Sequence, residues 1–383
     1  MMEKSKCCKI LDISDLHIGV SKVHPIAIRN HLMKYVYPHI NKDLFMVILN
    51  GDFFHTQLTM NGDAGITAGL IINDLIQLCV TNGVYLRVLR GTYSHDRNQN
   101  EWFLIGDTAE IKLGNQKLID VISTGIYFEV LQFQGKSLSI LYIPDNLPFE
   151  DVTQAAVDLM ESSNMKFDFI VTHGYYEHHL PKGLLKVPQN LLYQDKFLPY
   201  LNGYILNGHI HTSSLCKRVL TIGSFERFVH GEEESKGCYS INYGIDTHNC
   251  IFNFICNKGA TIFHTIDLVD CNTFEQALEI VNQDLNKLPI AEKKEAGEQL
   301  YIRIISDNLE LKQAVEVYLK EKYSNMLVSS VGLHTKNQIE EIATMQDNEL
   351  PEITPANLPS MIKKNCSLPL TEEQIQGVLD GTI

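Results

Sequence analysis

The length, composition and charge of the chain exclude several classes of protein. Its 383 residues are too many for one ordinary domain, and 44% hydrophobic with 20% charged residues is typical of a globular protein. Nine scattered cysteines without a CxxC pair argue against a disulfide framework or a thiolate zinc site, and the net charge of −14 counts against a simple electrostatic nucleic-acid binder.

In the first 260 residues, strand-like apolar runs alternate with helical patterns. We expect strands at 9–14, 44–50, 84–90, 137–143, 167–172 and 203–207, and helices at 25–41, 63–80 and 152–163. Three further strands, at 215–222, 237–243 and 249–255, follow more closely on one another, which predicts antiparallel pairing at the far side of a sheet. This alternation predicts an α/β layered fold.

The pattern changes near residue 260. A T-x-x-Q start at Thr273 predicts a helix with a capping box, and a strand at 299–306, a helix at 309–321 and a strand at 325–331 follow. Residues 334–383 are polar and proline-containing, as in a linker, and end in a short amphipathic helical pattern that either docks on a partner or packs back on the chain. We therefore expect domains at 1–260 and 261–333, followed by a tail at 334–383.

Five polar clusters rich in Asp or His follow predicted strands of the first domain. In chain order they contain Asp15 and His17; Asp52 and His55; Ser94, His95 and Asp96; His173; and His209 and His211. Ligands of open α/β sheets bind beyond the carboxyl ends of the strands, and residues two apart on a strand point the same way, so we expect Asp15 and His17 to face one site. A single histidine is more often an ordinary surface or core residue, as we expect for His178, His179 and His230. Five such clusters together predict a shared metal site.

The order of these motifs, D-x-H, G-D, a variant of G-N-H-D, a lone His-Gly and G-H-x-H, resembles that of the calcineurin-like metallophosphoesterases over residues 9–245. The resemblance implies a layered sandwich of two sheets flanked by helices. Within this superfamily the chain is similar to the SbcD-like nuclease subunit of double-strand-break repair complexes. His55 completes a G-D-x-x-H motif, the segment 223–237 (G-S-F-E-R, then Glu232, Glu233, Glu234 and Lys236-Gly237) resembles the family's segment after G-H-x-H, and a small α+β cap and a tail follow. The variant third motif suggests a phage-encoded relative.

The resemblance also implies roles for the motif residues. One metal would be held by Asp15, His17, Asp52 and His211, and the other by Asp52, His173 and His209, with Asp52 bridging. His95 would protonate the leaving 3′ oxygen or steady the phosphate, Asp96 would orient His95, and His55 would contact the scissile phosphate. Ser94 stands where the family has an asparagine ligand of the second metal, and its hydroxyl is a poorer neutral ligand.

The oxygen and nitrogen ligands, without thiolate, suit two divalent ions, Mn²⁺ before Fe or Zn. Such a pair would clamp the phosphate and generate a hydroxide for in-line attack. The resemblance implies a Mn-dependent DNA exo- and endonuclease that leaves a 5′ phosphate and a 3′ hydroxyl. It also implies that an SMC-like, SbcC-like ATPase binds the C-terminal tail, and that a homodimer forms through the first helices.

The sequence leaves two other functions open. The acidic charge favours a phosphatase or phosphodiesterase with a non-DNA substrate, and loss of a metal at Ser94 would leave a non-catalytic scaffold. Basic residues that could contact DNA are sparse and are expected to be ordinary solvated charges; they are Lys182, Lys186, Lys217, Arg218 and Arg227. With no apolar run of about 18 residues and no signal-peptide pattern, we expect a cytoplasmic protein without a membrane span, in the host cytoplasm if phage-encoded.

Overall fold

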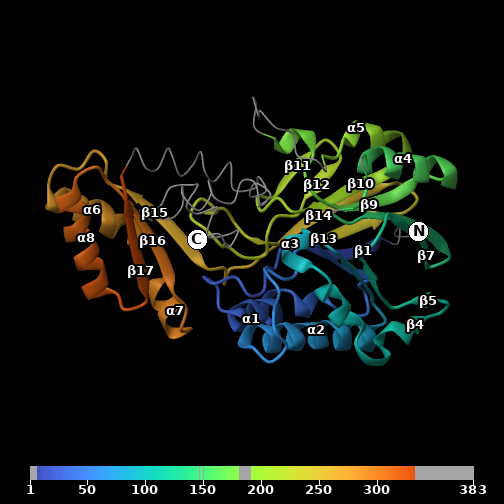
Figure 1. Ribbon diagram of the computed structural model, residues 1–383, viewed down its shortest axis with the longest axis horizontal. Helices are drawn as coiled ribbons and strands as arrows, with labels where there is room; N and C mark the ends of the chain where they lie inside the picture. Colours follow the sequence, from blue (N-terminus) through green and yellow to red (C-terminus); the bar gives the residue numbers. More distant parts are fainter. Residues whose placement is uncertain (1–6, 146, 150, 181–190, 333–383) are drawn as a thin grey trace, which may run out of the picture.

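A computed structural model describes residues 7–145, 147–149, 151–180 and 191–332 of the chain (Figure 1). The described residues form a mixed α/β structure with two six-stranded sheets and a separate three-stranded sheet, which confirms the expected α/β class. The tail at 334–383, with its predicted docking helix, and Lys182 and Lys186 lie outside the described residues.

The first sheet has the strand order β14-β13-β1-β2-β3-β6. Its strands are β1 (Cys8–Ile13), β2 (Met46–Asn50), β3 (Tyr85–Leu89), β6 (Ile119–Ile122), β13 (Gly237–Gly244) and β14 (Asn249–Cys256). Strands β1, β2, β3 and β6 run parallel, and β2 and β3 are buried along their whole length, as is typical of parallel strands covered on both faces. The helices α1 (Pro25–Tyr35) and α2 (Asp63–Asn82) cover the outer face (Figure 1).

Helix α2 is long and apolar enough to cross a membrane by length and composition alone. Its buried side chains, however, pack into the core around the first sheet. Core helices of globular proteins pass the same test, so this feature is weak evidence for a membrane span.

The second sheet has the order β11-β12-β10-β9-β8-β7. Its strands are β7 (Tyr127–Phe133), β8 (Lys136–Ile143), β9 (Phe167–His173), β10 (Leu201–Gly208), β11 (Ser214–Cys216) and β12 (Val219–Thr221), and α4 (Val152–Ser163) and α5 (Gln194–Phe197) lie on its outer side (Figure 1). One apolar cluster takes side chains from both sheets, such as Ile48 and Val171, so the sheets pack face to face. The short connecting elements are η1 (Tyr37–His39), α3 (Tyr93–Asp96), η2 (Gln99–Leu104), η3 (Gly106–Glu110), β4 (Lys112–Leu113), β5 (Gln116–Lys117), η4 (Glu177–His179) and η5 (Leu198–Tyr200).

Antiparallel pairing in residues 215–255 is confirmed, because β11 pairs with β12 and β13 with β14 in this way, but two details of the expectation were wrong. A turn at Lys217, with a φ of +51°, splits the first of the three strands into the hairpin β11–β12. The strands also do not share a sheet, because β12 pairs in parallel with β10 whereas β13 pairs antiparallel with β1. Those partners lie far away in the sequence, and local patterning carries no information about them.

The three-stranded unit contains the parallel strands β15 (Ile262–Asp267), β16 (Leu300–Ile305) and β17 (Met326–Val331). Helices α6 (Phe274–Leu285), α7 (Ile290–Glu295) and α8 (Leu309–Lys322) connect them, and the unit has an apolar core of its own. Thr273 caps α6 by accepting a hydrogen bond from the backbone N–H of Gln276 (3.3 Å), but the Gln276 side chain accepts from Asn272, so the expected capping box is not closed.

Candidate metal centre

The five Asp- and His-rich clusters meet where the carboxyl ends of β1, β2 and β3 approach those of β9 and β10. Backbone hydrogen bonds join the first two loops, from Asp15 N–H to the Gly51 carbonyl oxygen (3.1 Å) and from His17 N–H to the Asp52 carbonyl oxygen (2.9 Å). Gly51 allows a close approach between loops, because a Cβ atom there would lie 2.1 Å from Nδ1 of His173. The two sheets therefore contribute side chains to one site.

The alternation argument for Asp15 and His17 was wrong, although both residues lie in the site. Strand β1 ends at Ile13, and the backbone φ angles of Asp15 and His17 are +52° and +45°, in the left-handed region. The loop curls and is held against residues 51–53, which brings Nε2 of His17 to 3.8 Å from Oδ1 of Asp15.

Two groups of side chains in the site can each hold a metal ion. The first consists of Asp15, His17 and His211, and the second of Asp52, His173 and His209. In the first group the Nε2 atoms of His17 and His211 are 3.1 Å apart. The Asp52 carboxylate lies between the groups, since its Oδ2 is 3.3 Å from Nε2 of His173 and 3.7 Å from Nε2 of His17.

Unpaired buried atoms show that these residues fit a cation. Asp15 Oδ1 and His209 Nε2 are buried without a hydrogen-bond partner, and the buried Nε2 of His173 has only the Asp52 carboxylate beside it, at 3.3 Å. Buried polar atoms are costly unless they are paired, and a metal ion would pair several of them at once.

The other ring nitrogens of two candidate ligands are anchored. His173 Nδ1 donates to the carbonyl oxygen of Asn50 (2.8 Å), and His211 Nδ1 lies 2.6 Å from a carboxylate oxygen of Glu232. Metal-binding histidines are generally oriented in this way, with the second nitrogen left free for the ion. Sequence reasoning did not assign Glu232 to the site, although Glu232 lies in the segment after G-H-x-H that resembles the SbcD-like family, and that resemblance could have pointed to it.

Asp52 and His173 of the second group shift each other's pKa in opposite directions. Burial raises the pKa of Asp52, but the neighbouring His173 outweighs it and holds that pKa well below its usual range. Burial likewise lowers the pKa of His173, and Asp52 outweighs it and raises that pKa to about 10. Burial lowers the pKa of His209 to about 3, so its imidazole is neutral and free to act as a ligand.

His55 and His95 stack on each other beside His17. Their ring centroids are 5.2 Å apart at an interplanar angle of 25°, and the ring of His17 meets that of His95 edge-on at 4.8 Å. Nδ1 of His95 donates to the carbonyl oxygen of His55 (2.6 Å). The structure thus places both histidines at the edge of the site.

The expectation that Asp96 orients His95 was wrong. The Asp96 carboxylate is fully buried and accepts from the backbone N–H groups of Asp52 (3.1 Å), Phe54 (3.0 Å) and Gly91 (2.8 Å). Burial, followed by repulsion from Asp52, raises its pKa to about 6. Asp96 therefore holds the loop that carries Asp52, and the backbone of His55 orients His95.

The expectation for Ser94 was also wrong, because Thr92 takes the place beside the second group. Ser94 is exposed on the short helix α3, which the extra residues after Gly91 form. Thr92 donates to both carboxylate oxygens of Asp52, through its backbone N–H (2.6 Å) and its hydroxyl (3.3 Å), and Oγ1 lies 3.3 Å from Nδ1 of His209. A Cβ atom at Gly91 would come within 2.2 Å of Asp52, so only glycine fits before Thr92.

The three histidines that were not assigned to the site, His178, His179 and His230, contact neighbouring side chains. His179 is partly buried and contacts the hydroxyl of Thr221 through Nε2 (3.0 Å), and His230 packs edge-on against Phe263. The ring of His178 lies tilted against that of His179, at 4.1 Å between ring centroids, and stacks on Tyr176 at 6.0 Å.

The described basic residues considered for DNA contact also have protein partners. Arg218 and Arg227 donate to backbone carbonyl oxygens, and Lys217 pairs with Asp195. Arg218 and Arg227 therefore hold neighbouring loops in place.

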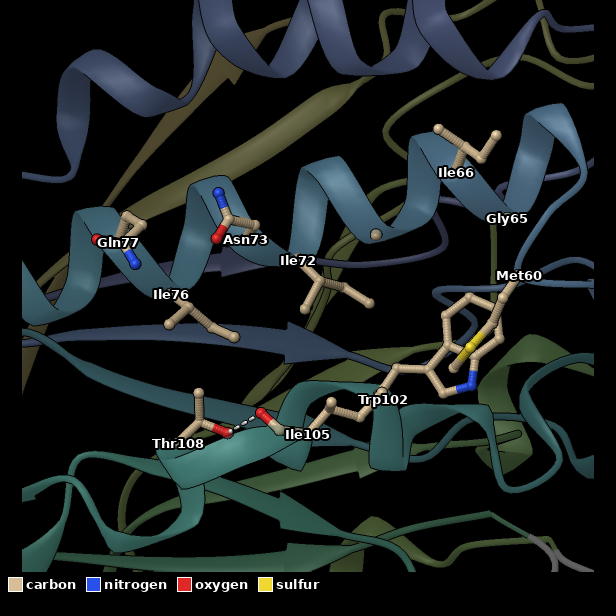
Figure 2. Close-up of a pocket in the computed structure, with 11 residues that line it drawn as sticks. Met60, Gly65, Ile66, Ile72, Asn73, Ile76, Gln77, Trp102, Ile105 and Thr108 are labelled. Carbon is tan, nitrogen blue, oxygen red and sulfur yellow. Dashed lines mark hydrogen bonds between the residues drawn. The ribbon is translucent and has the colours of Figure 1, made fainter.

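An apolar pocket of about 420 Å³ lies apart from these clusters, between α2 and the segment 102–108 (Figure 2). Ile72 and Ile76 of α2 face Trp102 and Ile105 across it (Figure 2). None of the predicted site residues lines this pocket.

Comparisons with known proteins leave the family open. No family model matches the sequence, and no curated protein sequence matches it. Among solved structures, GAP50, "the anchor in the inner membrane complex of Plasmodium", has 10% sequence identity and a TM-score of 0.36 over 66% of this chain and 85% of that chain. A second solved structure has 11% identity and a TM-score of 0.34 over 65% and 99% of the two chains. Likeness at this level carries no argument about function.

Proposed function

We propose that the chain is a Mn²⁺-dependent two-metal phosphodiesterase with the calcineurin-like sandwich fold, and within that superfamily an SbcD-like DNA exo- and endonuclease. One observation carries the proposal. The Asp52 carboxylate lies between two His/Asp groups, 3.3 Å from His173 and 3.7 Å from His17. Oδ2 of that carboxylate faces both groups, so Asp52 could contribute to the binding of both ions.

The ligand chemistry supports Mn²⁺ rather than a thiolate-bound ion. Both groups combine carboxylate oxygens with imidazole nitrogens, a set that suits Mn²⁺, Fe or Zn²⁺. When bound, two such cations neutralise the charge of a phosphodiester and supply a hydroxide nucleophile at neutral pH. The side chains of the site would hold the ions, while the neighbouring histidines act on the substrate.

His95 and His55 are the groups of this chain that would contact the phosphodiester. The Nδ1–H of His95 is committed to the carbonyl oxygen of His55, so the proton given to a leaving 3′ oxygen, or donated to a phosphate oxygen, would be carried on Nε2 of the imidazolium form. His55, stacked on it, would steady the same phosphate. Both rings are partly exposed, so a substrate outside the site can reach them.

The arrangement of the layers supports the proposed family. Two six-stranded sheets pack face to face with helices on their outer sides, and a small α/β unit follows. The SMC-like ATPase as partner of the tail, the homodimer and the cytoplasmic location rest on the resemblance. The net charge of −14 favours a second candidate, a phosphodiesterase or phosphatase with a substrate other than DNA.

Degradation of end-labelled linear double-stranded DNA tests the proposal. We expect degradation in Mn²⁺, less in Mg²⁺ and none in EDTA. His95→Asn should lower the rate by about 100-fold or more, because positioned general acids contribute roughly 10² to 10⁴. His39→Gln, at an exposed position in η1 after α1, serves as the matched control and should keep the wild-type rate.

Two outcomes would contradict the proposed nuclease activity. Turnover of p-nitrophenyl phosphate without loss of DNA would support the second candidate. A bound-metal count of one or none per chain, with neither substrate hydrolysed, would support a non-catalytic scaffold.

A further inference from the structure

A third group of imidazoles lies next to the two candidate metal-binding groups. The ligand nitrogens of His17, His55 and His95 all lie within 4.8 Å of one another. We propose that these three histidines form a separate Zn²⁺ site whose occupation switches the centre off. The inhibitory part of this inference rests on the proposed function; the metal site itself does not.

The spacing of the nitrogens fits a tetrahedral ion. Zn–N distances of about 2.0–2.1 Å place neighbouring ligand nitrogens roughly 3.3 Å apart. Nδ1 of His17 and Nδ1 of His55 are 3.3 Å apart. A ligand nitrogen of His95 lies within 4.8 Å of those of the other two histidines, and both His55 and His95 are partly exposed, so their rings have room to turn towards an ion.

The chemistry of the group favours Zn²⁺ over Mn²⁺. The group contains three neutral nitrogen donors and no carboxylate, whereas Mn²⁺ and Mg²⁺ prefer oxygen ligands. Three protein ligands with an open fourth position are a common arrangement for Zn²⁺. The exposed sides of His55 and His95 provide access for the ion.

His95 is oriented like the histidines of the other two groups. Its Nδ1 donates to the carbonyl oxygen of His55 (2.6 Å), as that of His173 does to Asn50 (2.8 Å). Such a contact fixes the tautomer and leaves Nε2 as the ligand atom. The ring of His17 is held edge-on by Phe228 at 5.0 Å between ring centroids.

Because both sites use His17, the third site and the first group cannot hold a metal ion at the same time. Its Nε2 faces His211 (3.1 Å) and the carboxylates, whereas its Nδ1 faces His55 (3.3 Å). A neutral imidazole has one unprotonated nitrogen, so His17 can serve only one of the two sites at a time. Zn²⁺ at the third site would therefore release the ion beside Asp15 and also occupy the two histidines that act on the phosphate.

The test uses the full chain loaded with Mn²⁺ and exposed to buffered Zn²⁺. Bound Zn²⁺ and released Mn²⁺ are counted by elemental analysis, and hydrolysis of bis(p-nitrophenyl) phosphate is followed in parallel. We expect one Zn²⁺ bound, one Mn²⁺ released and hydrolysis lost. His55→Gln, and separately His95→Gln, should weaken Zn²⁺ binding by about 100-fold or more, since even outer contacts of metal ligands contribute 10- to 100-fold. His39→Gln should bind Zn²⁺ like the wild type.

The outcomes separate this inference from the proposed function. If both variants bind Zn²⁺ as tightly as the wild type, Zn²⁺ merely replaces Mn²⁺ in the first two groups and the inference is overturned. If Zn²⁺ binding depends on His55 and His95 but the Mn²⁺-loaded chain hydrolyses neither the diester nor DNA, the zinc site is supported and the proposed function fails.

Discussion

The Asp52 carboxylate shows how single atoms determine what the centre can bind. Its Oδ1 accepts the backbone N–H of Thr92, and its Oδ2 faces the Thr92 hydroxyl, His173 and His17. The same hydroxyl lies 3.3 Å from Nδ1 of His209. Thr92 thus orients two candidate ligands of the second group without needing to bind the ion itself.

Replacing Thr92 by valine, which has the same shape without the hydroxyl, should weaken metal binding at the second group by about 10- to 100-fold. The Asp52 carboxylate and the His209 ring would both lose an orienting contact. Isothermal titration of the metal-free protein with Mn²⁺ measures the loss.

Ser94→Ala is the matched control for Thr92→Val. Ser94 is exposed on α3, so its removal should leave the affinity within about twofold, well below the effect of an orienting contact. An equal loss of Mn²⁺ affinity in the two variants would instead show that Ser94 also supports the second metal-binding group.

At the scale of elements, a buried polar cluster joins the two six-stranded sheets. Arg87 of β3 binds both carboxylate oxygens of Glu129 of β7 (2.7 and 2.8 Å), and the hydroxyl of Tyr142 of β8 donates to the same carboxylate (2.7 Å). All three side chains are buried. The cluster fixes the two sheets relative to each other, and hence the loops that carry the candidate ligands.

Replacing only one residue of the Arg87–Glu129 ion pair should strongly destabilise the fold. Glu129→Leu or Arg87→Met leaves a buried charge without its partner, which costs about 3–5 kcal/mol. The double variant removes both charges and should cost only about 1–3 kcal/mol, the penalty of the unpaired Tyr142 hydroxyl. Urea unfolding of the four proteins measures the differences.

Lys217→Met provides the comparison, because it breaks an ion pair with Asp195 in which both side chains are more than half exposed. Its urea midpoint should equal that of the wild type. For the buried pair, the double variant could instead lose as much unfolding free energy as the two single variants together. That result would show that Arg87 and Glu129 act independently.

At the scale of the whole molecule, a buried ionic cluster ties the three-stranded unit to helix α1. His31 of α1 lies 2.5 Å from Glu226, in the loop before β13, and 3.2 Å from Glu298, in the loop before β16. Lys293 of α7 completes the cluster by binding Glu298. Burial alone would lower the pKa of His31, but the two carboxylates outweigh it and raise that pKa to about 9.

The stability of the protein should therefore fall as the pH rises from about 6.5 to about 9. The folded state keeps the His31 proton up to about pH 9, whereas the unfolded chain releases it near pH 6.5, so its contribution is complete below pH 6.5. The loss should amount to about 3 kcal/mol in the free energy of unfolding. Chemical denaturation at a series of pH values measures it.

His31→Gln should remove this part of the pH dependence, and the exposed His39→Gln should retain it. An unchanged slope in His31→Gln would place the titrating group elsewhere.

Where local signals were complete, the sequence predicted structure closely. Helix α4 covers the expected residues 152–163, because Asp151 caps its start by accepting from Gln154 and Asn164 ends it in a left-handed conformation. The apolar runs that became β2, β3 and β9 are buried throughout. The polar residues after each run were visible for the same reason, since they interrupt the apolar pattern.

The sequence by itself determined the strands and helices with complete local signals, such as β2, β3, β9 and α4, and that Asp- and His-rich clusters follow five strands. These properties depend on residues close together in the chain. Only the tertiary structure decided that β12 and β13 lie in different sheets, that Thr92 rather than Ser94 faces Asp52, and that Asp96 supports a loop instead of His95. Each depends on contacts between residues tens to hundreds of positions apart, and no local pattern encodes which of those distant atoms come into reach.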